Sequence, residues 1–156
     1  MFPSELFSLF PPFPRNQHVF VAMSFDPMFK HRWKVVIEPT IQGLGLKPIR
    51  VDASTISDSI LTKILRGISD SRLIFADITA VRRRRNSNVM YEIGYSHGRG
   101  LTPLIYTRDA DRLTHLPVYF RTLNVRMASG TTPVNILIED YLRSLKTTRR
   151  LNQHSI

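Results

Sequence analysis

A carboxylate stands among apolar and small residues in the stretch Asn88–Gly100, NVMYEIGYSHGRG. Apolar side chains recur there at helical spacing, and Glu92 lies between Met90 and Ile93 in or near the first turn of the predicted helix. An acid in a first turn interacts favourably with the helix dipole, which contributes roughly 0.3–1 kcal/mol. The glycines that follow weaken a helix by roughly 1 kcal/mol each, which is typical of a place where something approaches closely. Two interpretations stay open, a structural acid at a helix end and a carboxylate that does chemistry.

The elements that must position Glu92 alternate along the chain. Four apolar runs predict strands at 18–25, 46–51, 71–76 and 101–107. Helical spacing separates them at 28–44, at 57–70 and in the quoted stretch, and a short strand near 123–127 precedes a helix near 134–146. Because crossovers of this length join parallel strands, the order predicts an α/β fold. We expect a five-stranded parallel sheet in a flavodoxin-like three-layer sandwich.

Three residues predict local features of these elements. Pro39 lies inside the first helical pattern, where proline removes a backbone donor, so we expect a kink. Pro48 lies in the second strand pattern and favours an edge position. Ser57 is a suitable N-cap for the helix that follows it.

Polar residues follow the predicted strands. In open parallel sheets the ligand binds beyond the carboxyl ends of the strands, near the point where the strand order reverses. The residues at these positions are Ser24, Phe25, Asp26, Asp52, Asp77 and the segment Thr107–Asp109. This edge is therefore the predicted binding site.

Three sequence strings support this placement by their likeness to a known group. FVAMSF at 20–25, ADIT at 76–79 and N-x-NVMYEIG at 86–94 resemble the nucleoside 2-deoxyribosyltransferase-like group and its relatives in the bacterial TIR-like superfamily. The resemblance extends from about His18 to Ile105. It implies that Glu92, in the YE-x-G helix, is the catalytic residue.

The chain departs from the pattern of that group at three positions. Ser87 replaces the usual proline between the two asparagines, and Ser96 stands where many relatives have alanine. True deoxyribosyltransferases commonly carry an aspartate six residues before the glutamate, and this chain has Asn86 there. The last departure affects transfer to a second base more than simple hydrolysis.

The chemistry implied by the resemblance is cleavage of an N-glycosidic bond in a nucleoside, a nucleotide or NAD. Glu92 in its ionised form stabilises or captures the oxocarbenium-like sugar, and the helix N-terminus favours that charge. A neutral base takes up a proton as it leaves, whereas nicotinamide leaves as a neutral molecule without one. Among its possible partners Asp77 is the first choice, for ribose hydroxyls or for the base, and capping of the next loop is the equal alternative. His97, at the helix end, is not favoured for catalysis.

Further residues are expected to complete the substrate site. Asn88 and Tyr91 line the sugar pocket with Asp77, Ser24 lies beside them, and Phe25 stacks on the base. Any of Arg82, Arg83, Arg84 or Arg85 that turns inward would clamp a phosphate. A solvated loop is the alternative for at least two of these arginines, and a nucleic-acid surface is a further one.

Composition limits the class of protein. The 156 residues suit a single domain, expected at 17–148, between a proline-rich leader at 1–16 and a basic tail at 149–156. The formal charge of +10 favours anionic ligands, but without zinc-finger spacing or an aromatic RNA-binding strand nucleic acid is the less favoured partner. The chain has no cysteine, no histidine spacing suited to a metal and no apolar run of membrane-spanning length. We expect a cytoplasmic protein with no cofactor, metal or membrane partner.

A second class of function also fits the sequence. The same pocket would serve a non-catalytic nucleotide sensor or a TIR-like protein-interaction module in bacterial signalling or defence. Self-association into a homo-oligomer is an expectation for either class. Release of a base from a nucleoside, a nucleotide or NAD distinguishes the enzyme from the sensor.

Overall fold

The computed structural model describes residues 17–52, 58–108, 126–129, 133–141 and 143. The expected leader, the basic tail, the Ser57 cap and residues 123–125 lie outside these ranges. None of the helices in the described ranges has both the length and the apolar character that crossing a bilayer demands.

The sheet is parallel throughout. Its strands are β1 (His18–Ala22), β2 (Lys47–Ile49), β3 (Leu73–Asp77), β4 (Leu104–Thr107) and β5 (Arg126–Ser129). They are ordered β2-β1-β3-β4-β5, so the strand order reverses between β1 and β3. This order is that of the flavodoxin-like α/β folds. The edge position expected for the proline-containing strand is confirmed, because β2 pairs only with β1 among the described strands.

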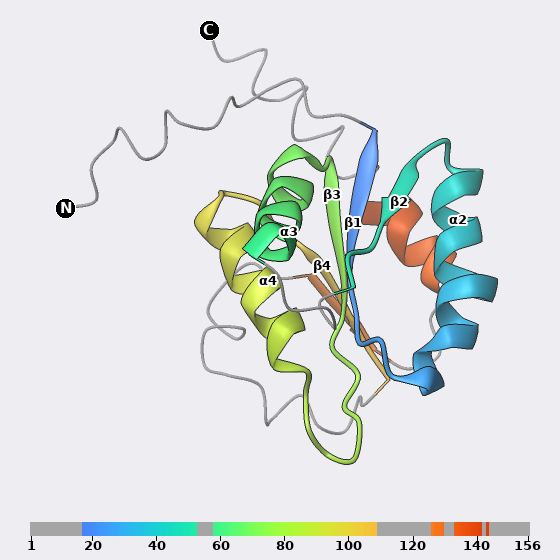
Figure 1. The fold of residues 1–156 in the computed structure, drawn as a ribbon. Helices are drawn as coiled ribbons and strands as arrows, with labels where there is room; N and C mark the ends of the chain where they lie inside the picture. Colours follow the sequence, from blue (N-terminus) through green and yellow to red (C-terminus); the bar gives the residue numbers. More distant parts are fainter. Residues whose placement is uncertain (1–16, 53–57, 109–125, 130–132, 142, 144–156) are drawn as a thin grey trace, which may run out of the picture.

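Helices cover both faces of the sheet, as Figure 1 shows. On one face lie α3 (Asp58–Asp70) and α4 (Ser87–Gly98). On the other lie α2 (Glu38–Gly43) and a helix at 134–141. Each face has its own cluster of buried apolar side chains, with Phe75, Trp33 and Ile138 in one and Ile74, Ile64 and Ile93 in the other. The α/β three-layer arrangement is therefore confirmed.

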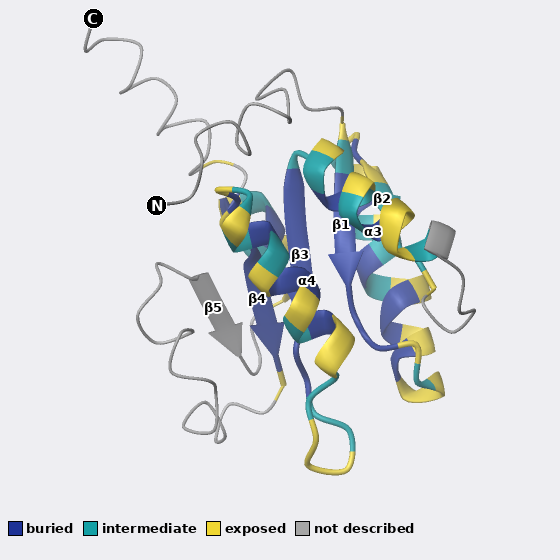
Figure 2. Cartoon of the chain, turned by 60° about the vertical axis from the view of Figure 1, so that its left-hand side comes forward, coloured by how far each residue is buried: buried dark blue, intermediate teal, exposed yellow. Residues whose placement is uncertain are grey.

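Strand β3 lies in the middle of the sheet and all five of its residues are buried (Figure 2). Successive side chains of a strand point to opposite faces. Leu73 and Phe75 accordingly belong to the cluster beneath α2, whereas Ile74 and Ala76 belong to the cluster beneath α3 and α4. The same alternation sends the side chain of Asp77 toward the α2 face.

The first helical segment departs from the single kinked helix expected from the sequence. A 3-10 turn, η1 (Pro27–Phe29), leads to a π-helical segment, η2 (Arg32–Ile37), which continues into α2. Pro39 is the second residue of α2, in a helix that continues from η2 without a break, so the helix lacks one backbone donor at this point. The wider turns of η2 include the hydrogen bond from the Glu38 N–H to the Trp33 carbonyl. The helix is thus widened before the proline.

Gly67 on α3 and Gly94 on α4 provide a matched test of how α3 packs on β1. A Cβ at residue 67 would lie 3.0 and 3.1 Å from two ring carbons of the buried Phe20, whereas one at residue 94 would meet nothing within 4 Å. Both alanine variants gain helix propensity, but only Gly67→Ala is overpacked. We expect Gly67→Ala to be less stable than Gly94→Ala by about 1–3 kcal/mol in urea unfolding. Equal stabilities would show that Phe20 moves freely.

Candidate functional site

Glu92 lies in the second turn of α4 rather than in or near the first. The helix begins at Ser87, and the Asn86 side chain caps it by accepting hydrogen bonds from the N–H groups of Asn88 at 2.9 Å and Val89 at 3.2 Å. No acidic residue occupies the first turn. Because the dipole acts mainly on the first turn, a simple helix-end role does not account for Glu92.

The Glu92 side chain is buried on the face of α4 that packs against the sheet. It shares this face with Val89, Ile93 and Ser96, and the residue is only 6% exposed. Burial raises the pKa of Glu92 from its ordinary 4.5 to about 7. Within the described ranges no hydrogen bond or ion pair reaches the carboxyl group. Burial thus outweighs the expected effect of the helix N-terminus, and at neutral pH the carboxyl group is ionised only in part.

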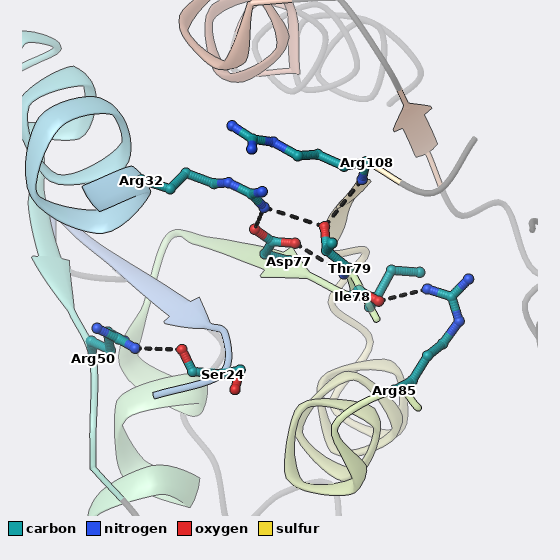
Figure 3. Close-up of polar contacts among 8 residues, drawn as sticks. All are labelled: Ser24, Arg32, Arg50, Asp77, Ile78, Thr79, Arg85 and Arg108. Atoms are coloured by element: carbon teal, nitrogen blue, oxygen red, sulfur yellow. Dashed lines mark hydrogen bonds and ion pairs between the residues drawn. The ribbon is translucent and has the colours of Figure 1, made fainter. Parts of the chain in front are cut away.

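Asp77 is buried as well, but it has a cationic partner. Its Oδ2 forms an ion pair with Nη1 of Arg32 on η2, and both side chains are almost fully enclosed. Its Oδ1 accepts a hydrogen bond from the Thr79 N–H at 3.0 Å, so Asp77 also caps the loop that follows β3. Figure 3 shows these contacts together. Asp77 thus joins β3 to the α2 layer.

Thr79 extends this group of contacts to the next strand. Its hydroxyl oxygen accepts hydrogen bonds from Nη1 of Arg32 at 3.2 Å and from the backbone N–H of Arg108, just after β4, at 3.0 Å. The guanidinium of Arg32 also lies 5.3 Å from the Phe29 ring centroid and 5.4 Å from that of Tyr106. Arg32 therefore connects η2, β3 and β4 at the carboxyl edge.

Arg32 was not among the residues predicted for this edge. A signal for it was available, because Arg32 is three residues after Phe29 and four before Val36, on the apolar face of the helical pattern. A charged residue on such a face is rarely fully buried unless it is paired. Asp77, at the end of a buried strand, was the natural candidate for its partner.

The arginine loop folds as a tight turn. Val81 and Arg84 exchange two backbone hydrogen bonds of 2.8 and 2.9 Å. Between them Arg82 and Arg83 have φ angles of 48° and 66°, which side-chain-bearing residues rarely adopt, and both are exposed. Arg85 turns inward, but its Nη1 donates to the Ile78 carbonyl at 2.5 Å (Figure 3). One arginine of the run thus closes its own loop, and the other three are exposed.

Ser24 and Phe25 form the turn between β1 and η1. Ser24 is buried, and its hydroxyl accepts a hydrogen bond from the Asp26 N–H at 3.1 Å. The Ser24 carbonyl accepts one from Nη2 of Arg50, which follows β2, at 2.6 Å. Asp26 caps η1 through the Met28 N–H at 3.0 Å. This turn lies at the carboxyl end of β1, next to the point where the strand order reverses.

The remaining expected residues lie on α4. Asn88 is exposed and one helical turn from Glu92 on the same side, toward the carboxyl edge. Tyr91 is 55% exposed and lies about 100° around the helix from Glu92. His97 lies in the last turn, and burial lowers its pKa, which disfavours the cationic ring. The described residues contain no cluster of three His, Asp or Glu side chains suited to a metal ion.

Comparison with known proteins identifies a fold. No protein-family model matches this chain, and no curated protein matches it in sequence. A solved structure described as 2-desoxiribosyltransferase from Leishmania mexicana aligns with a TM-score of 0.52 and 20% sequence identity. The alignment covers 62% of this chain and 66% of that chain. The fold is therefore deoxyribosyltransferase-like.

The Arg32–Asp77 pair generates a prediction about stability. Arg32→Met leaves a buried carboxylate without its cation and should lower the free energy of unfolding by about 3–5 kcal/mol. Adding Asp77→Asn removes that charge while Oδ1 can still accept from the Thr79 N–H, so the double variant should regain most of the loss. Urea unfolding of the two single variants and the double variant measures the coupling. A double variant no more stable than Arg32→Met would contradict this account.

Glu92 generates a prediction about pH. With a folded-state pKa of about 7 against 4.5, the folded protein binds the extra proton between these pH values. The contribution of this proton to the free energy of unfolding is fully present below pH 4.5 and is lost as the pH rises through about 7. Relative to Glu92→Gln, which cannot ionise, the wild type should lose roughly 3 kcal/mol of unfolding free energy across this window. Parallel curves of stability against pH would show that Glu92 does not titrate this way.

Proposed function

We propose that this protein cleaves the N-glycosidic bond of a nucleoside, a nucleotide or NAD, with Glu92 as the catalytic residue. The observation that carries the proposal is the burial of Glu92 without a cationic partner among the described residues, beside the carboxyl edge of a parallel sheet. Burying a carboxyl group without a partner disfavours its charged form. A strongly shifted carboxyl group at a ligand edge is a candidate for chemistry.

In the proposed reaction the bond between the anomeric carbon and the base nitrogen breaks, and its electron pair leaves with the base. The ionised Glu92 oxygen faces the opposite side of the sugar, where it stabilises the positive carbon or bonds to it. Water then supplies the new oxygen substituent at that carbon. The proton that water loses balances the one taken up by a neutral base, and it goes to solvent when nicotinamide leaves. A second base in place of water would give transfer, and the presence of Asn86 rather than aspartate favours hydrolysis.

The substrate would occupy the carboxyl edge between β1 and β3. Ser24 and Phe25 lie at the end of β1, and Asn88 lies one turn from Glu92 toward the same edge. Asp77 has its side chain fully buried against Arg32, so its role is to hold the loop after β3 in place. The exposed side chains of Tyr91 and the arginine turn would approach the outer part of the substrate, including a phosphate.

The fold is consistent with this proposal. The structure from Leishmania mexicana is described as a 2-desoxiribosyltransferase, and it shares the fold of this chain. Sugar–base cleavage is the chemistry that the sequence strings at 20–25, 76–79 and 86–94 also imply. The resemblance to TIR-like proteins, which favours NAD, rests on these strings alone.

The test is base release by wild type and Glu92→Gln. Purified protein is incubated with deoxynucleosides, deoxynucleotides and NAD, and free base is measured by chromatography. We expect release from at least one substrate and a loss of at least about a hundredfold in Glu92→Gln, because an amide cannot act as the anion. Glu139→Gln, on the helix at 134–141, is the matched control and should keep full activity.

The outcomes separate the two classes of function. Turnover by a well-folded Glu92→Gln variant would reject the role of Glu92. A ligand that binds and is recovered intact from the wild type would instead support the nucleotide sensor.

A further inference from the structure

One face of the Phe25 ring is covered by a cation. The guanidinium carbon of Arg50 lies 3.7 Å from the Phe25 ring centroid, which is direct stacking contact. Phe25 is nevertheless 42% exposed. Because Arg50 occupies one face, the surface of the ring left for a ligand is the opposite face and the edge. An aromatic face open at the ligand edge of the sheet is a surface on which a planar base can stack.

Arg50 is held in this position by both neighbouring strands. It follows β2, and its Nη2 donates to the carbonyl of Ser24, at the end of β1, at 2.6 Å. The Trp33 ring centroid lies 5.3 Å from its guanidinium carbon. Burial lowers the pKa of Arg50, but an arginine remains protonated at neutral pH. The cation is therefore a fixed part of the turn that presents Phe25.

Nearby acids do not remove this positive charge. Asp52 and Glu38 act electrostatically on Arg50. Glu38 forms an ion pair with Lys34 at 2.8 Å, and Asp52 is exposed to solvent, where its field is screened. The carboxylate of Asp26 accepts a hydrogen bond from the N-terminus of η1. The guanidinium is thus the charge that lies directly on the ring.

We infer that Arg50 determines specificity: stacked behind Phe25, it selects a neutral nucleobase over a cationic ring such as nicotinamide in NAD. This inference rests on the proposed function, since it places the leaving base on Phe25. A base stacked about 3.5 Å beyond the ring lies roughly 7 Å from the guanidinium. At effective dielectric constants from about 80 to about 20, repulsion at that distance weakens binding of a cation roughly three- to fiftyfold.

The charge of Arg50 distinguishes the two branches of the proposed reaction. NAD carries a positive charge on the ring that leaves, whereas the bases of ordinary nucleosides are neutral. Arg50 therefore favours the branch in which the departing nitrogen takes up a proton. The substrate class that follows is a nucleoside or nucleotide with a neutral base.

The experiment measures binding rather than turnover, and it uses the full chain carrying Glu92→Gln. Fluorescence quenching of 2-aminopurine 2′-deoxyriboside reports stacking on Phe25. Two competitors then displace it: nicotinamide riboside, whose ring is cationic, and benzamide riboside, which has nearly the same shape and no charge. We expect benzamide riboside to compete about tenfold better.

Variants at residue 50 connect this preference to the guanidinium charge. Arg50→Gln keeps a polar side chain but carries no charge, and it should bring the affinities of the two competitors to within about twofold of each other. Arg50→Lys keeps the charge and should retain most of the preference. Arg72→Met, at the amino edge of the sheet, is the control and should leave it unchanged. Phe25→Leu should weaken 2-aminopurine binding at least about fivefold, because it removes the stacking face.

Two results would overturn the inference. One is equal competition by the two ribosides in the Glu92→Gln protein that keeps the native Arg50. The other is an unchanged preference in Arg50→Gln. Neither depends on base release, so loss of the proposed enzymatic activity and loss of this specificity can be told apart.

Discussion

The desolvation free energy of a buried charge is the constraint on which the carboxyl edge of this sheet depends. Two carboxyl groups are buried there under opposite conditions. Asp77 is compensated by Arg32 and by the Thr79 N–H, and it connects the central strand to the α2 layer. Glu92 lies on α4 across the sheet with no such partner among the described residues, and burial raises its pKa to about 7. The first arrangement stabilises the edge, whereas the second carries a desolvation cost that no ion pair among the described residues offsets.

The alternation of side chains along β3 produces this division. Leu73, Phe75 and then Asp77 face the α2 layer, so Asp77 is directed to a helix that also carries Arg32. Glu92 belongs to the opposite layer, with Val89 and Ile93. A ligand at the edge would therefore bridge two layers that have separate cores. The turn of Ser24 and Phe25 lies between them, at the end of β1.

The sequence predicts the three layers and the carboxyl edge of the sheet better than it predicts the ionisation and the pairing of the side chains at that edge. Strand patterns rich in apolar residues and helical spacing are local signals, and they place Glu92 on a helix and Asp77 at a strand end. The raised pKa of Glu92 and the Arg32–Asp77 pair depend on which side chains face each other across the sheet. The stacking of Arg50 on Phe25 joins the segments that follow β2 and β1. Such contacts follow from packing, and spacing along the chain does not encode them directly.

The π-helical segment η2 limits how the chain can change in length. Each residue added to or removed from a helix turns everything beyond it by about 100°. Arg32 begins η2, and Pro39 and α2 follow within a few residues. A deletion that converted η2 to ordinary helix would rotate Arg32 away from Asp77 or turn α2 off the sheet. Natural variation in length is therefore expected in the loops on either side of this helix and not within it.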